Sequence, residues 1–117
     1  MHALIIEDEP VIAMMIEDEL RDLGYRSFDV ACDEEQAVRL AERTCPALIT
    51  ADDRLATGSG IGAVRRICAE TALPVVFITG NPHELGIPDA VCLAKPFGAA
   101  DFQEAVQRAA RSAQTYA

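Results

Sequence analysis

Five polar side chains, from four separate parts of the sequence, each follow a short apolar segment with the composition of a buried strand. They are the carboxylates of Glu7, Asp8 and Asp52, the hydroxyl of Thr79 and the ammonium group of Lys95. Crowded carboxylates repel one another, and Mg²⁺, which accepts a few carboxylate oxygens and keeps several waters, relieves that repulsion. A hydroxyl and an ammonium group suit a phosphoryl group, and an aspartate can be the nucleophile that forms an acyl phosphate. The combination indicates a phospho-accepting aspartate with Mg²⁺ beside it.

Short apolar segments and amphipathic segments alternate along the chain, which predicts alternating strands and helices. The expected strands are residues 3–6, 26–30, 47–51, 75–78 and 90–94, and the expected helices are 10–23, 34–43, 61–68 and 99–113. Such alternation is typical of βαβ units, with a parallel sheet covered by helices on both faces. We therefore expect an α/β fold in which the polar residues after the strands meet at one edge of the sheet.

The first helix should turn an apolar face toward the sheet. Its apolar positions recur at steps of three and four: Ile12, Met15, Ile16, Leu20 and Leu23. Pro10 suits its first turn, and Gly24 is placed to cap its end. By contrast, only ten residues separate Thr79 from Ala90, the lower limit for a parallel crossover. This length restricts a fourth helix to one turn near Asn81.

The chain is acidic, with 19 acidic and 10 basic residues among 117 and a net charge of −9. Eleven of the acids lie in residues 1–35, beside only Arg21 and Arg26. An acidic chain without a basic stripe is a poor partner for nucleic acid or an anionic membrane surface, so we expect neither. The longest apolar run, residues 11–16, is too short to cross a bilayer. An acidic start does not suit a signal peptide, which makes the cytoplasm the expected location.

The chain has four cysteines, at Cys32, Cys45, Cys68 and Cys92. They form no Cys-x-x-Cys pair and have no histidine at ligand spacing, which argues against a zinc or thiol-redox site. We expect each of them to be a small buried hydrophobe in a reducing compartment.

Several motifs give the sequence a resemblance to one known family. They are Leu4-Ile5-Ile6-Glu7-Asp8-Glu9, Asp52-Asp53-Arg54-Leu55 with Gly60-Ile61, Phe77-Ile78-Thr79-Gly80, and Lys95-Pro96-Phe97. With these motifs the sequence resembles the receiver domain of two-component response regulators over nearly the whole chain. The resemblance implies a three-layer, doubly wound (βα)5 domain of the flavodoxin or CheY-like type. Its five-stranded parallel sheet would have the strand order 2-1-3-4-5.

The resemblance also implies a role for each residue of the predicted site. Asp52 would accept a phosphoryl group from a histidine kinase or a histidine phosphotransfer protein. Four groups would hold Mg²⁺, namely Glu7, Asp8, Asp52 and the main-chain carbonyl of Arg54. Thr79 and Lys95 would contact the phosphoryl group, and the peptide bond between Lys95 and Pro96 would be cis.

Asp53, next to Asp52, is a rival nucleophile. Adjacent side chains on a strand point to opposite faces, which places Asp53 away from the face of Asp52. The family's spacing from Asp8 also favours Asp52, and we take Asp52 as the acceptor.

The sequence departs from the family pattern at three places. Ala56 replaces a usual proline, Cys92 stands where the family mostly has an aromatic switch residue, and the fourth helix is cut down. Because a thiol cannot swing as a ring does, we expect phosphorylation to order or melt residues 81–88 instead. The stretch from Phe77 to Gly80 is also similar to an atypical receiver subset found in general stress phosphorelays.

The match ends near residue 113, so we expect residues 1–117 to form a single receiver domain without an output domain. Its output would then be contact with other proteins, in one of two roles that the sequence does not separate. It would either pass the phosphoryl group onward to a phosphotransfer histidine or bind a downstream protein target when phosphorylated. We expect no enzyme activity beyond its own phosphorylation and dephosphorylation.

Other interpretations fit less well. Gly58-x-Gly60-x-x-Ala63 imitates a dinucleotide fingerprint but does not follow a first strand, and a flavin or nucleotide binder would need glycine where Glu7 and Asp8 stand. An aspartyl-phosphate-type phosphatase would need an acid at Arg54, which arginine cannot supply. A degenerate receiver that serves only as a docking module remains open, although the intact Asp52, Thr79 and Lys95 count against it.

Overall fold

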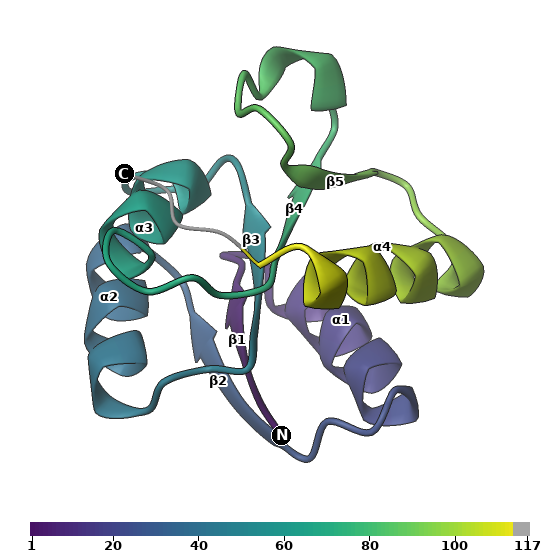
Figure 1. Ribbon diagram of the computed structural model, residues 1–117, viewed down its shortest axis with the longest axis horizontal. Coiled ribbons are helices and arrows are strands. Elements are labelled where there is room, and N and C mark those ends of the chain that lie inside the picture. Colours follow the sequence, from purple (N-terminus) through teal and green to yellow (C-terminus); the bar gives the residue numbers. More distant parts are fainter. Residues whose placement is uncertain (114–117) are drawn as a thin grey trace.

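The computed structural model describes residues 1–113 as one parallel sheet flanked by helices (Figure 1). The strands are β1 (His2–Ile6), β2 (Ser27–Ala31), β3 (Leu48–Asp52), β4 (Val75–Thr79) and β5 (Val91–Ala94). The α-helices are α1 (Pro10–Asp22), α2 (Glu34–Arg43), α3 (Gly60–Ile67) and α4 (Ala99–Arg111). A single 3₁₀ turn, η1 (Pro82–Glu84), lies between β4 and β5.

The sheet has the order β2-β1-β3-β4-β5, with every neighbouring pair parallel. The predicted α/β class and strand order are therefore confirmed. Each predicted strand and α-helix lies within about two residues of its place in the structure. The short connection after β4 holds only the one turn η1, as its length required. Helix α4 ends at Arg111, before the predicted residue 113.

Helices cover both faces of the sheet, which makes three layers (Figure 1). Ala3 and Ile5 of β1 join the core beneath α1 and α4, whereas Leu4 and Ile6 join the core beneath α2 and α3. This alternation follows from the period of two along a strand. All the residues of β3 and β4 are buried, as expected of central strands in a parallel sheet.

Local sequence signals explain the ends of the helices. Pro10 is the first residue of α1, and Gly24 adopts φ +100° just beyond its end, a conformation that favours glycine. The carboxylate of Asp33 accepts a hydrogen bond from the Gln36 amide at 2.8 Å and so caps α2. Ser59 caps α3 in the same way, through the Gly62 amide at 2.9 Å.

Two expectations about burial are wrong. Met15 was expected to face inward, but it is 52% exposed, because α1 buries only the narrow stripe of Ala13, Ile16 and Leu20. Cys32 and Cys45 were expected to be buried, but both are exposed, since they lie in connections just beyond β2 and α2. Cys68 is fully buried and Cys92 partly so. None of the described helices is long and apolar enough to span a membrane.

Candidate functional site

The predicted site residues meet at the carboxyl edge of the sheet. Glu7 and Asp8 directly follow β1, Asp52 and Thr79 are the last residues of β3 and β4, and Lys95 directly follows β5. The Lys95 amide also donates to the Thr79 carbonyl at 3.0 Å, which keeps Lys95 beside the end of β4. The parallel strands thus bring together five residues from four separate parts of the sequence.

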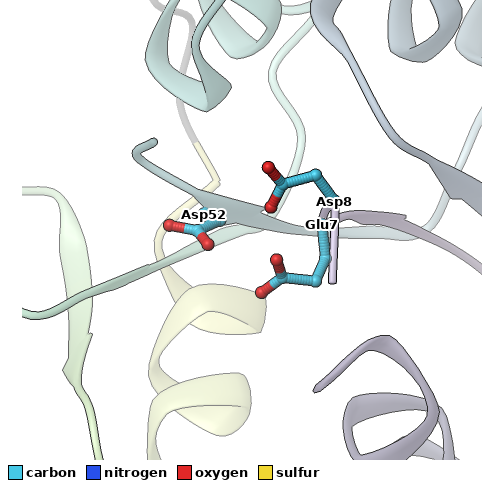
Figure 2. A group of neighbouring side chains, drawn as sticks. All are labelled: Glu7, Asp8 and Asp52. Atoms are coloured by element: carbon cyan, nitrogen blue, oxygen red, sulfur yellow. The ribbon is translucent and has the colours of Figure 1, made fainter. Parts of the chain in front are cut away.

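Three carboxylates form the centre of the site. Glu7, Asp8 and Asp52 each offer an oxygen, and these oxygens lie within 4.8 Å of one another. Figure 2 shows the carboxylates of Glu7 and Asp8 extending from the end of β1 toward Asp52. Glu7 is 1% exposed, and among residues 1–113 its Oε1 has no hydrogen-bond partner. Burial raises the pKa of Glu7 to about 7, and the nearby Asp52 carboxylate adds to this rise.

Lys95 supplies the positive charge at this edge. Its Nζ donates a hydrogen bond to Asp52 Oδ2 at 2.9 Å and lies 3.8 Å from Glu7 Oε1. Although burial alone would raise the pKa of Asp52, Lys95 and the Arg54 amide hold that pKa below its ordinary value. The two carboxylates in turn raise the pKa of Lys95 against the effect of its own partial burial. Asp52 and Lys95 therefore face each other as an ionised pair.

Main-chain amides fix two of the carboxylates from the segment after β3. The Arg54 amide donates to Asp52 Oδ1 at 3.2 Å, and the Ala56 amide donates to Asp8 Oδ2 at 2.9 Å. A proline at position 56 could not make the second bond, since it has no N–H. The Glu9 amide donates to Glu7 Oε2 at 3.1 Å. The positions of these three carboxylates therefore depend on the path of the backbone just after β1 and β3.

A cavity of about 380 Å³ opens over these groups. Asp8, Asp52, Thr79 and Lys95 line it, as does Arg54 from the segment after β3. The cavity combines carboxylates, a hydroxyl and an ammonium group, which are the groups that the sequence placed at this edge. It can accept a small anionic group that approaches Asp52.

Asp53 also belongs to this cavity, contrary to expectation. It was expected to point away from the face of Asp52, but Thr79 Oγ1 donates a hydrogen bond to Asp53 Oδ2 at 2.8 Å. The expectation is wrong because β3 ends at Asp52, so Asp53 lies in a bend where strand alternation no longer applies. The sequence offered one signal for its presence, namely a second acid directly after the strand.

The donor set fits a hard divalent cation. The three clustered carboxylates are oxygen ligands, and the unpaired Glu7 Oε1 is a buried acceptor of the kind that a cation would satisfy. A single ammonium group leaves this cluster with an excess of negative charge.

Residues 3–107 match the sequence model of the response regulator receiver domain. The chain belongs to the response regulator receiver family. It is 39% identical over 112 residues to the phyllosphere-induced regulator PhyR of Methylorubrum extorquens, covering 91% of this chain and 42% of PhyR. It is 32% identical over 112 residues to the transcriptional regulatory protein PdtaR of Mycobacterium tuberculosis, covering 91% of this chain and 55% of PdtaR. The receiver thus spans about half the length of these curated relatives.

Solved receiver structures have the same architecture. The response regulator PhyR from Brucella abortus superposes with a TM-score of 0.83 at 38% identity, over 93% of this chain and 46% of that chain. The receiver domain of the sensor histidine kinase PA1611 from Pseudomonas aeruginosa gives a TM-score of 0.80 at 37% identity, over 95% of this chain and 98% of that chain. That structure has a magnesium ion coordinated in its active-site cleft. The inferred family and fold are confirmed, as is the cis peptide bond between Lys95 and Pro96.

Proposed function

We propose that this receiver is active and that Asp52 accepts a phosphoryl group from a phosphohistidine of a kinase or a phosphotransfer protein. The observation that carries this proposal is the placement of Asp52 at the end of β3. Its carboxylate is paired with Lys95 at 2.9 Å and clusters with the oxygens of Glu7 and Asp8 within 4.8 Å. The Lys95 ammonium keeps Asp52 ionised, which is the state that a nucleophilic carboxylate requires.

The transfer is a displacement at phosphorus. An Asp52 carboxylate oxygen forms the new P–O bond while the P–N bond of the phosphohistidine breaks, and the electron pair returns to the imidazole nitrogen. Lys95 is positioned to donate to the oxygens of the transferred group, since its Nζ already donates a hydrogen bond to Asp52 Oδ2. Thr79, whose hydroxyl lines the same cavity, is the second donor. We propose that the chain's own chemistry is limited to gaining and losing this phosphoryl group.

Glu7, Asp8, Asp52 and the Arg54 carbonyl would hold Mg²⁺. Bound Mg²⁺ supplies positive charge that offsets the negative charge of the phosphoryl oxygens. The chain prepares for this ion by fixing Asp8 through the Ala56 amide and Glu7 through the Glu9 amide. Both contacts leave the second oxygen of each carboxylate available, and Glu7 Oε1 has no hydrogen-bond partner within the part of the chain that is described.

We propose that the signal leaves the domain through contact with a second protein. A relative of known structure, from Bartonella quintana, is described as the anti-anti-sigma factor PhyR, and it is 38% identical over 93% of this chain. A protein target, in addition to the phosphodonor, is therefore the output that we assign to this chain. A phosphatase acting through Asp52 and Arg54 is disfavoured, because the guanidinium stays protonated and cannot act as the general acid.

Intact mass spectrometry tests the assignment of Asp52. Wild type, Asp52→Asn and the matched control Asp53→Asn are incubated with acetyl phosphate, with and without Mg²⁺. We expect one phosphate adduct on wild type and on Asp53→Asn in the presence of Mg²⁺, and no adduct on Asp52→Asn. Circular dichroism checks that each variant is folded.

Each alternative has its own outcome in this experiment. Adduct on Asp52→Asn and none on Asp53→Asn would move the acceptor to Asp53. No adduct on folded wild type with acetyl phosphate, together with no binding of beryllofluoride, would favour the degenerate docking module over an active receiver.

A further inference from the structure

The Thr79 hydroxyl has its one proton committed to Asp53. Thr79 is 1% exposed, and its Oγ1 donates to Asp53 Oδ2 at 2.8 Å while it accepts a hydrogen bond from the Asn81 amide at 3.0 Å. A hydroxyl can donate only one hydrogen bond. In this arrangement Thr79 therefore cannot also donate to a group carried by Asp52.

Asp53 and Asp52 hold different partners although they are adjacent in sequence. Asp52 accepts from Lys95, while Asp53 reaches across to the last residue of β4. Both aspartates line the same cavity, so a phosphoryl group on Asp52 would enter a space that already contains the Asp53 carboxylate. Asp53 Oδ2 already holds the Thr79 proton, so an acceptor carried by Asp52 would have to displace it.

The same hydroxyl also connects the site to the segment that follows β4. Asn81, whose amide donates to Thr79 Oγ1, is the residue just before η1. A rotation of the Thr79 side chain that moved Oγ1 toward an acceptor on Asp52 would also move Oγ1 relative to the Asn81 amide that donates to it. Thr79 Oγ1 is therefore an atom that Asp53 and the start of the segment after β4 share.

We propose that Asp53 is a positioning residue that holds the Thr79 hydroxyl in the unphosphorylated arrangement and opposes the change that phosphorylation brings. The proposal rests on the function proposed above, in which Thr79 donates to the phosphoryl group on Asp52. Asp53 acts by competing with that group for the Thr79 proton. Its removal lowers the free-energy cost of the phosphorylated arrangement and leaves the hydrogen bond from Lys95 to Asp52 in place, while the contribution of Asp53 to holding the pKa of Asp52 below its ordinary value is lost.

Beryllofluoride binding at saturating Mg²⁺ tests this role. Asp53→Ala removes the acceptor, and we expect it to tighten beryllofluoride binding roughly tenfold, the factor that a hydrogen bond to a charged acceptor is worth. Asp53→Asn retains a weaker, neutral acceptor and is expected to tighten binding roughly threefold. In NMR spectra without beryllofluoride, the Asn81 amide signal of Asp53→Ala should shift toward its position in the beryllofluoride-bound wild type.

A double-mutant cycle with Thr79→Val separates positioning from simple charge repulsion. Asp53→Ala should leave beryllofluoride affinity unchanged in the Thr79→Val background, because no hydroxyl remains to be released. An equal gain in both backgrounds would mean that Asp53 acts only as a like charge, and the proposal would be wrong. Asp18→Ala, which removes an exposed acid from α1, is the control for net charge and should match wild type.

Two further outcomes would overturn the proposal. Unchanged affinity in both Asp53→Ala and Asp53→Asn would show that the hydrogen bond does not oppose the switch. Weaker Mg²⁺ binding by Asp53→Asn would make Asp53 part of the metal site instead. If wild type itself bound neither beryllofluoride nor phosphate, the proposed function would fail first, and that result is distinct from a failure at Asp53.

Discussion

The buried carboxylate of Glu7 lacks hydrogen-bond partners for one of its two oxygens within the described residues. Within the described residues its Oε1 accepts no hydrogen bond, and the nearest ammonium, Lys95, is 3.8 Å away and already bonded to Asp52. In the metal-free protein Glu7→Gln should therefore raise the free energy of unfolding, by about 1 kcal/mol, because it removes a poorly compensated buried charge. Urea denaturation at pH 8 with a chelator present measures this change.

The same variant should respond less to Mg²⁺. Adding Mg²⁺ should stabilise wild type more than Glu7→Gln, since an amide is a weaker ligand for a hard cation than a carboxylate. Asp18→Asn makes the same chemical change at an exposed position on α1 and should match wild type in both conditions. A Glu7→Gln protein that is less stable without metal and equally stabilised by Mg²⁺ would remove Glu7 from the metal site.

The cysteines should differ in reactivity according to their surroundings. Cys32 and Cys45 are exposed, whereas burial raises the pKa of the Cys68 thiol to about 11 and also raises the pKa of Cys92. Because the thiolate is the reactive form, iodoacetamide at pH 8 should modify Cys32 and Cys45 first. Intact mass should show two adducts before any third, and Cys32→Ala should reduce them to one. Rapid alkylation of Cys68 in the folded protein would contradict the burial of that thiol.

At the level of single residues, sequence patterns located the site but not all of its contacts. The carboxylates of Glu7, Asp8 and Asp52 were found because each follows a strand, and strand ends share one edge in a parallel sheet. Asp53 was misplaced because the period of two holds only while the strand continues. Its bond to Thr79 depends on how the backbone bends after β3, which no local pattern specifies.

Helices and strands were predictable where buried residues recur with the period of the element. The ends of helices were predictable where a capping residue is present. Pro10, Asp33 and Ser59 mark the starts of three helices. The inward face of α1 was less predictable, because Val11, Met14 and Met15 are apolar yet more than half exposed. Hydrophobic spacing identifies a helix, but the width of the buried stripe depends on how closely neighbouring elements approach.

The packing of α3 against β3 requires glycine at its first residue. A Cβ on Gly60 would clash with the Asp52 carbonyl oxygen, a backbone atom that no side-chain rotation moves away. Gly60→Ala should therefore destabilise the fold by about 2–3 kcal/mol and displace the end of β3 that carries Asp52. Gly80→Ala is the matched control, since a Cβ there meets nothing within 4 Å. Thermal denaturation of the two variants should separate them clearly, and equal stability would refute the close approach.

At the scale of the molecule, alternation of strands and helices predicted a parallel sheet with helices on both faces. The order of strands did not follow from that alternation, because several orders satisfy right-handed crossovers equally well. It came from the resemblance to the receiver family, and the observed order β2-β1-β3-β4-β5 agrees with it. Long-range topology was thus the part of the fold for which the family mattered most.

The net charge of −9 makes any stabilisation by Mg²⁺ a combination of general screening and specific binding. The two are separable, because screening acts on all exposed charges whereas binding requires the cluster of Glu7, Asp8 and Asp52. At a Mg²⁺ concentration 100 times Kd, binding should add about 2.7 kcal/mol to the free energy of unfolding. We expect Tm to rise with MgCl₂ well beyond the rise with NaCl of equal ionic strength. Asp8→Asn should abolish that excess while keeping the NaCl response, and an excess that survives in Asp8→Asn would place the cation elsewhere on the acidic surface.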